Sequence, residues 1–353
     1  MRFPATIAPI VSTPALNTSP SEHISRKAAE IEPLQPVYSL VQADFQAVNA
    51  LIPKQLTSDV DLVSEIGAYI VESGGKRLRP LMVLLTSGAL EYTQDDRHIK
   101  LAATIEFLHT ATLLHDDVVD HSALRRGKLT ANEKWGNAPS VLVGDFLYSR
   151  AFQMMVEIGE LSVMEILADA TNTIAEGEVL QLANIGNTKT TEPEYREIIR
   201  CKTALLFEAA CHSAAALAQG SVATDAMRRF GLHFGITYQL VDDWLDYIGS
   251  SETLGKNVGD DLAEGKMTLP LIYALENSSS NASAVIEGAI QSKSADNLPH
   301  ILDIVVESGA LDYVKQAVHR EADLAHDCLS SLSNNEYVEA LHTLTSYSTS
   351  RVC

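Results

Sequence analysis

Apolar residues recur at three- and four-residue intervals along most of the chain from residue 37 onward, a spacing that predicts α-helices. In the range 101–119, Leu101, Ile105, Leu108 and Val119 follow this spacing or its multiples. Similar stripes predict helices over residues 141–158, 161–182, 195–218, 226–248 and 269–275. Alternating apolar and polar runs bounded by tight-turn dipeptides, which would predict β-hairpins, are missing from the sequence. We therefore expect an all-α fold.

Glycine, proline and serine mark the connections between the predicted helices. Connections are expected at Gly74-Gly75, 136–139, Gly186-Asn187 and 249–265, and a surface loop is expected at the Ser- and Asn-rich range 277–283. No short repeat divides the chain. We predict one large domain over residues 34–353, in preference to two.

The first 33 residues differ from the rest of the chain. They hold five of the twelve prolines and many Ser and Thr residues, and they have no sustained periodicity. We expect residues 1–33 to be a disordered N-terminal extension or to precede the true start of the protein. A targeting peptide is typically rich in arginine, whereas Arg2 is the one basic residue among the first twenty.

Composition and charge narrow the class of function. The 353 residues include 26 Lys and Arg and 46 Asp and Glu, a net charge of −20 with His neutral. This balance argues against a nucleic-acid binder and against permanent docking on an anionic membrane. No uninterrupted apolar run reaches the roughly 18–20 residues that span a bilayer. The cysteines, which form no CxxC pair, are expected to be reduced thiols of a cytoplasmic enzyme: Cys201, Cys211, Cys328 and Cys353.

Three carboxylates come together at the end of the predicted helix 101–119. Asp116 and Asp120 are one helical turn apart, and Asp117 lies three residues before Asp120, so all three share one face. Like charges at this spacing destabilise a bare helix, and the flanking residues are apolar, so a cation must neutralise the group. Oxygen ligands suit Mg²⁺, which typically binds substrate phosphates as well. A single cluster of this kind would most simply be a solvated acidic turn.

The same DDxxD spacing recurs at Asp242, Asp243 and Asp246, again inside an apolar helix. Two such clusters make a pair of solvated turns a poor explanation. They favour two helices that face each other across a cavity, with metal ions between the carboxylates and a polyphosphate.

Basic residues beside glycines would supply further charge for a polyphosphate. Arginine offers a bidentate fork to phosphate, and lysine offers a point charge. Each basic run alone is an ordinary charged surface, but their concentration in so acidic a chain favours anion sites. The residues concerned are Lys76, Arg77 and Arg79, then Arg125 and Arg126, and late in the chain Lys256 and Lys266.

These motifs, taken in order, resemble those of the trans-isoprenyl diphosphate synthases, or polyprenyl synthetases. The resemblance rests on GGKRLRP, LLHDDVVD, RRG, GDFLYSRAF, QLVDDWLD and GKNVGDDLAEGKMTLP, and it runs from about residue 40 to the C-terminus. The segments FLHTATLLHDDVVD, SVLVGDFLYSRAFQMM and AEGEVLQL most resemble the bacterial octaprenyl diphosphate synthase branch. The chain departs from many short-chain relatives at Gln181, where an acidic residue is common.

The resemblance implies a single helical-bundle domain with a central cavity, and usually a homodimer. It also implies an enzyme that condenses isopentenyl diphosphate head-to-tail with an allylic prenyl diphosphate such as farnesyl diphosphate. The product would be a long all-trans polyprenyl diphosphate, octaprenyl by resemblance, for quinone side chains, with transient membrane contact at its release. Mg²⁺ would be held by Asp116, Asp117, Asp120, Asp242 and Asp246. The allylic diphosphate would contact Arg125, Lys202, Lys256 and Lys266. Isopentenyl diphosphate would contact Lys76, Arg79, His109 and Arg126, and Thr203 and Gln239 would lie near the developing cation.

Product length is expected to depend on the helix that carries the first cluster. A growing prenyl chain would pass Thr112, Ala111 and Leu108, and the small side chains at 111 and 112 leave this path open. We expect Met155, beside Phe152, to form the floor. Small residues at these positions would otherwise indicate only close helix packing.

Two other functions fit part of the pattern. A terpene cyclase also ionises a prenyl diphosphate with a DDxxD motif, but it has one substrate and needs no second anion site. A non-catalytic regulatory subunit would keep the fold but lose acidic residues, and both clusters are complete here. A synthase of shorter or longer product remains a third possibility.

Overall fold

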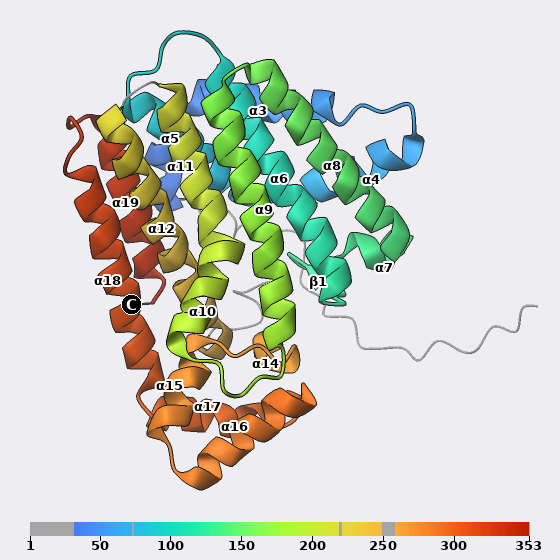
Figure 1. Ribbon diagram of the computed structural model, residues 1–353, viewed down its shortest axis with the longest axis vertical. Helices are drawn as coiled ribbons and strands as arrows, with labels where there is room; N and C mark the ends of the chain where they lie inside the picture. The colour runs from blue at the N-terminus through green and yellow to red at the C-terminus, as the bar shows by residue number, and fades with distance from the viewer. Residues whose placement is uncertain (1–31, 73, 219–220, 249–257, 353) are drawn as a thin grey trace, which may run out of the picture.

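The computed structural model describes residues 32–72, 74–218, 221–248 and 258–352. Nearly all of this chain is helical (Figure 1). In chain order the helices are η1 (Glu32–Leu34), α2 (Gln35–Leu40), α3 (Gln42–Gln55), α4 (Asp61–Glu72), α5 (Leu78–Ala89), α6 (Arg97–Val119), α7 (Ala131–Trp135), α8 (Asn137–Ile158), α9 (Leu161–Asn184), α10 (Glu192–Ile199), the π-helical η2 (Arg200–Ala204), α11 (Leu205–Leu217), α12 (Ser221–Ile248), α14 (Asp260–Ala263), α15 (Leu269–Asn277), α16 (Ser280–Ser292), α17 (Leu298–Glu307), α18 (Ala310–Leu329) and α19 (Glu336–Ser350). The expectation of an all-α fold is confirmed.

The long helices run roughly along the length of the molecule, and α16 and α17 lie at one end of it (Figure 1). Helix α6 packs along α8, while α12 packs against both α11 and α18. Helices α6 and α8 are antiparallel, because Ser140 Oγ donates to the Leu114 carbonyl near one end and Lys100 pairs with Glu157 at 2.9 Å near the other. Their buried faces form part of a large apolar core, and a second core lies among the C-terminal helices.

Most predicted helices have similar ends in the structure, but two connections are shorter than predicted. The loop expected at 277–283 is reduced to Ser278 and Ser279, because α15 extends to Asn277 and Ser279 caps α16 by accepting a hydrogen bond from the Ala282 backbone N–H at 3.4 Å. The connection expected at 136–139 is reduced to Gly136, since α8 begins at Asn137 and tolerates Pro139 in its first turn.

One short hairpin was not predicted. Strands β1 (Leu124–Arg125) and β2 (Lys128–Leu129) pair antiparallel directly after α6. The two turn residues, Arg126 and Gly127, both have positive φ angles, 54° and 74°, as a type I′ turn requires. The hairpin is too short to give an alternating pattern, but it places two arginines beside the first acid cluster.

The predicted domain start lies close to the first described element. Leu34, the residue at the predicted boundary, is fully buried, and η1 begins two residues earlier at Glu32. The prediction for residues 1–31 lies outside the described part of the chain.

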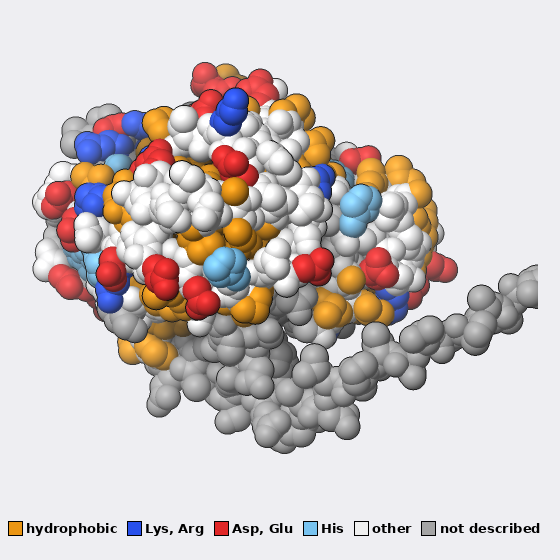
Figure 2. Space-filling model, turned by 90° about the horizontal axis from the view of Figure 1, so that it is seen from below, with side chains coloured by type: hydrophobic (Ala, Val, Ile, Leu, Met, Phe, Trp, Pro, Cys, Tyr) orange, Lys and Arg blue, Asp and Glu red, His pale blue; other side chains and the backbone are white. Residues whose placement is uncertain are grey.

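The surface agrees with the acidic composition. At the end of the molecule seen in Figure 2, acidic side chains are spread across the face and are not gathered in one place. Within the described ranges, no helix combines the length and apolar character needed to cross a bilayer.

Candidate active site

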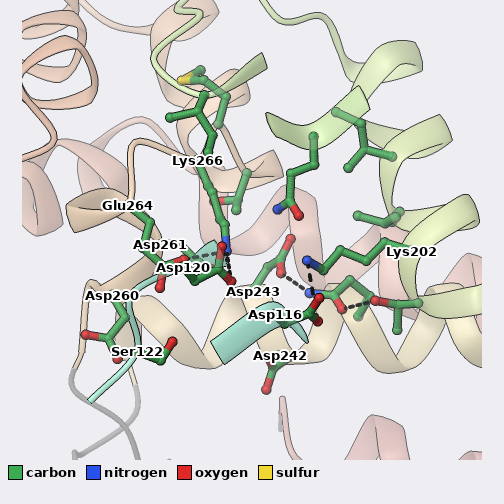
Figure 3. Close-up of a pocket in the computed structure, with 18 of the residues that line it drawn as sticks. Asp116, Asp120, Ser122, Lys202, Asp242, Asp243, Asp260, Asp261, Glu264 and Lys266 are labelled. Atoms are coloured by element: carbon green, nitrogen blue, oxygen red, sulfur yellow. Dashed lines mark hydrogen bonds and ion pairs between the residues drawn. The ribbon is translucent and has the colours of Figure 1, made fainter. Parts of the chain in front are cut away.

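A cavity of about 460 Å³ opens among the ends of α6, α9, η2, α12 and α14 and the β1 hairpin strand. Six aspartates, one glutamate and several basic side chains line it together with uncharged residues (Figure 3). The charged lining residues are Asp116, Asp120, Asp242, Asp243, Asp260, Asp261, Glu264, Arg125, Arg126, Lys202 and Lys266. The two DDxxD helices therefore do face one cavity.

The three acids of the first cluster do not all reach this cavity. Asp116, in the last turn of α6, and Asp120, its C-cap, line the cavity. Asp117 is fully buried and is not among the lining residues; its Oδ1 accepts hydrogen bonds from the Arg125 guanidinium at 2.7–2.8 Å. Asp117 thus anchors the hairpin arginine in this structure.

Two lysines supply positive charge to the cavity-facing pair (Figure 3). Lys266 Nζ lies 3.1 Å from Asp120 and also pairs with Glu264, while Lys202 Nζ lies 3.8 Å from Asp116. Burial raises the pKa of Asp116. Burial also acts to lower the pKa of Lys266, but the nearby carboxylates together outweigh it and raise that pKa, so the lysine stays charged.

The second cluster divides differently from the first. Asp242 and Asp243 line the cavity, whereas Asp246 is fully buried and accepts a 3.4 Å hydrogen bond from the Asp261 backbone N–H. Asp243 accepts from Tyr195 Oη at 2.5 Å and from Gln239 Nε2 at 2.6 Å. Burial raises the pKa of Asp243 to about 7. Asp243 is therefore held in place by two donors.

The predicted cation-facing pair lies in the same cavity as the two clusters. Thr203 Oγ1 donates to Gln239 Oε1 at 2.8 Å, and both residues line the cavity. Thr203 and Lys202 lie in η2, the π-helical segment between α10 and α11. A Cβ on Gly235 would lie 2.5 Å from Ala204 Cα, so this glycine allows α12 to approach η2 closely.

The four residues predicted to bind isopentenyl diphosphate come from three segments. Arg79 NH1 lies 3.3 Å from His109 Nε2, and the Arg79 guanidinium lies 4.1 Å from the centre of the Phe207 ring. The Arg126 guanidinium lies against Gly75, where an added Cβ would come within 2.6 Å of it. Lys76 Nζ donates to Tyr347 Oη at 3.1 Å. The glycine-rich segment, α6 and the hairpin tip therefore meet in one basic region.

Burial sets the protonation of this region. It lowers the pKa of His109 well below the ordinary value, an effect reinforced by the nearby arginines, so the imidazole is neutral at pH 7. Burial also lowers the pKa of Arg79, to about 10, which leaves it charged. Glu106 is the acid of this region, and Arg77 Nε lies 3.8 Å from it.

The predicted chain-length residues lie outside the lining of the cavity. Ala111 and Met155 are fully buried in the core between α6 and α8, and Thr112 Oγ1 donates to the His109 carbonyl at 2.8 Å. None of the three lines the cavity. Because α6 and α8 are antiparallel, Met155 lies roughly 20 Å from Asp116 along the helix axis at 1.5 Å per residue.

Phe152 does not lie in the core beside Met155, contrary to the expectation from the sequence. Its side chain is 37% exposed and packs against Tyr148. Phe152 is three positions before Met155, which turns the two side chains about 60° apart around α8. Lys256, another predicted contact, lies outside the described residues.

Sequence reasoning missed several residues in or next to the cavity. Glu178 accepts a hydrogen bond from Lys202 Nζ at 2.7 Å, and Tyr195 holds Asp243. Asp260 and Asp261 also line the cavity. They lie within the GKNVGDDLAEGKMTLP motif, and the two adjacent acids were the signal that could have identified them. Glu178 had no signal in the sequence other than its place after Gly177 in the AEGEVLQL segment.

Comparisons with known proteins agree with this geometry. The family model described as Polyprenyl synthetase matches residues 60–305. The chain is 47% identical to octaprenyl diphosphate synthase of Escherichia coli over 87% of this chain and 96% of that protein. It is 44% identical to the all-trans-nonaprenyl-diphosphate synthase (geranyl-diphosphate specific) of Rhodobacter capsulatus over 90% and 98%.

A solved structure has the same fold. The crystal structure of a polyprenyl synthase from Caulobacter crescentus, complexed with calcium and isoprenyl diphosphate, superimposes with a TM-score of 0.87 at 44% identity and covers 91% of this chain and 98% of its own. The family match covers well over half of the chain, and the relatives are matched along nearly their whole length. This chain therefore belongs to the polyprenyl synthetase family.

Proposed function

We propose that this protein is a long-chain trans-prenyltransferase that condenses isopentenyl diphosphate head-to-tail with an allylic diphosphate, to give octaprenyl diphosphate for quinone side chains. One observation carries the proposal. Two aspartate-bearing helices line one cavity, and a separate basic region containing Arg79 and His109 lies beside it. Two anion sites suit two diphosphate substrates, whereas a terpene cyclase would need one.

The donor set of the cavity fits Mg²⁺. No three His, Cys, Asp or Glu side chains of the described residues are grouped closely enough to hold an ion by themselves. Mg²⁺ does not need such a cage, because it is usually bound by one or two carboxylates together with substrate phosphates and water. Asp116, Asp120 and Asp242 offer such carboxylates. Bound Mg²⁺ would neutralise the charge that develops on the departing diphosphate.

Basic side chains of the protein would bind and orient the two substrates. Lys202, Lys266 and Arg125 line the cavity and can contact the allylic diphosphate where its negative charge increases during ionisation. Arg79 and Arg126 would bind the diphosphate of isopentenyl diphosphate, and neutral His109 can donate one hydrogen bond to it.

Polar oxygens would face the allylic cation. The Thr203 hydroxyl and the Gln239 carbonyl are hydrogen-bonded to each other, and Gln239 is fixed in turn by Asp243. This chain of hydrogen bonds orients both dipoles in the cavity, and neither of these two oxygens is a charged nucleophile that could trap the cation.

The octaprenyl length rests on two supports. The Escherichia coli relative is an octaprenyl synthase, although a comparably similar relative makes a nonaprenyl product. In this chain the small side chains of Ala111 and Thr112 leave room for a prenyl chain to pass along α6, provided that the core between α6 and α8 opens around it.

We also propose a homodimer formed through α8 and α9. Apolar side chains are exposed along one face of each helix, and large exposed apolar surfaces are typical of subunit interfaces. The residues are Leu142, Phe152 and Val156 on α8, and Val179 and Leu182 on α9. Light scattering should give twice the mass of one chain, and Val156→Arg should lower the measured mass.

We also propose a cytoplasmic location, which is favoured by the buried free thiols of Cys201, Cys211 and Cys328.

Incorporation of labelled isopentenyl diphosphate by the purified chain tests the proposed function. Farnesyl diphosphate and Mg²⁺ should support incorporation, and EDTA should abolish it. Asp116→Ala and Asp242→Ala should each lower kcat by orders of magnitude and leave the helical circular dichroism unchanged. Conversion of farnesyl diphosphate alone would indicate a cyclase, and no turnover without another protein would indicate a regulatory subunit.

A further inference from the structure

Glu178 contributes a carboxylate to the active site that the DDxxD motifs do not account for. It lies on α9, and its Oε2 accepts a hydrogen bond from Lys202 Nζ at 2.7 Å. The same Nζ lies 3.8 Å from Asp116 Oδ2. The ammonium group of Lys202 is thus shared by two acids, and it is hydrogen-bonded to Glu178.

The backbone of α9 and η2 brings these two residues together. A Cβ on Gly177 would lie 2.5 Å from Cys201 Cβ and 3.4 Å from the Lys202 backbone nitrogen, so glycine lets the two segments approach closely. Glu178 and Lys202 each directly follow one of the residues at this contact. The ion pair is therefore built by the packing of two helical segments and is not a chance surface contact.

The environment makes the position of this lysine consequential. The side chains of Lys202, Glu178 and Asp116 are 21%, 27% and 17% exposed, so solvent screens their charges only in part. A lysine has a flexible four-carbon stem, and without Glu178 its best partner within reach would be Asp116. An ammonium group bonded to Asp116 would occupy the carboxylate that we assign to the metal.

We infer that Glu178 is a positioning residue that holds Lys202 away from Asp116 and in reach of the allylic diphosphate. The inference rests on the proposed roles of Lys202 and Asp116. Glu178 acts through the lysine and need not touch substrate. Its removal should therefore weaken the use of the allylic substrate and of Mg²⁺, while the isopentenyl diphosphate site stays intact.

Steady-state kinetics of Glu178→Gln test this inference. The substitution keeps the side-chain size and a carbonyl acceptor but removes the charge. Because Lys202 would lose its charged partner and could turn to Asp116, the KM for farnesyl diphosphate should rise about tenfold or more. The Mg²⁺ concentration for half-maximal rate should rise as well, and the KM for isopentenyl diphosphate should stay unchanged.

Two further variants make the test specific. Glu176→Gln is the matched control, since Glu176 is an exposed residue of the same helix whose carboxylate accepts from Asn172 at 3.0 Å, and it should behave as the parent. In a Lys202→Met background, Glu178→Gln should change nothing further, because its effect passes through the lysine.

Three results would overturn the inference: unchanged kinetics in Glu178→Gln, equal effects on both substrates, or a full additional loss in the Lys202→Met background. Unchanged kinetics in Lys202→Met alone would instead contradict the proposed role of Lys202. Circular dichroism of each variant would show whether the fold is retained, so that a loss of activity can be assigned to the site.

Discussion

Gly177→Ala should damage the active site from a position that touches no substrate. The added Cβ would lie 2.5 Å from Cys201 Cβ, whereas two carbons pack at about 3.5–4.0 Å. Helix α9 and η2 would have to separate by about 1 Å to accept it. Because Lys202 and Thr203 lie in η2, both would move with it.

The magnitude follows from two opposing terms. Overpacking by one methyl group typically costs about 1–3 kcal/mol, and alanine stabilises a helix interior by about 1 kcal/mol relative to glycine. The free energy of unfolding should therefore fall by roughly 0–2 kcal/mol. A displacement of about 1 Å in catalytic groups can lower the rate about 100-fold, so activity should suffer far more than stability.

Urea unfolding followed by circular dichroism, together with kcat, would measure both effects. Gly288→Ala is the matched control, because Gly288 lies in α16 with no heavy atom within 4 Å of the added Cβ. That variant should be as active as the parent and about 0.5–1 kcal/mol more stable. If Gly177→Ala were equally active and equally stabilised, the close approach of α9 and η2 described above would be wrong.

Three further predictions concern the substrates, the product and the N-terminal segment. Arg79→Ala should mainly raise the KM for isopentenyl diphosphate, and Lys202→Ala should impair use of the allylic substrate; equal effects on both substrates would refute this partition. Ala111→Tyr should shorten the products towards 15 or 20 carbons without abolishing catalysis, and Met155→Ala should lengthen them, as mass analysis would show; an unchanged distribution would mean that the prenyl chain does not pass this face. Deletion of residues 1–31 should leave the melting temperature and kcat nearly unchanged, because this segment has no apolar face to bury; an unstable product would contradict that reading.

The helices were predictable because their apolar periodicity is a local property of the sequence. The π-helical turn of η2 was not, since it lies where Gly177 and Gly235 admit close approach by two other helices. The loop predicted at 277–283 is shorter in the structure for a local reason. Serine and asparagine are common in loops, but serine is also a good N-cap, and Ser279 caps α16.

The acid clusters show the limit of motif spacing. Both have the same DDxxD pattern, yet the first and last acids of one cluster line the cavity, Asp116 and Asp120, while the first two line it in the other, Asp242 and Asp243. The rotation of each helix about its axis decides this, and tertiary packing sets that rotation. Glu178 was missed for a related reason, because its partner Lys202 is distant in sequence.

Mass analysis of the dephosphorylated products from farnesyl diphosphate and excess isopentenyl diphosphate, made by the purified chain with Mg²⁺, tests the central claim most directly. The proposed function predicts a series of linear all-trans prenols that ends at eight isoprene units. A single cyclic hydrocarbon, or no product longer than the primer, would contradict it.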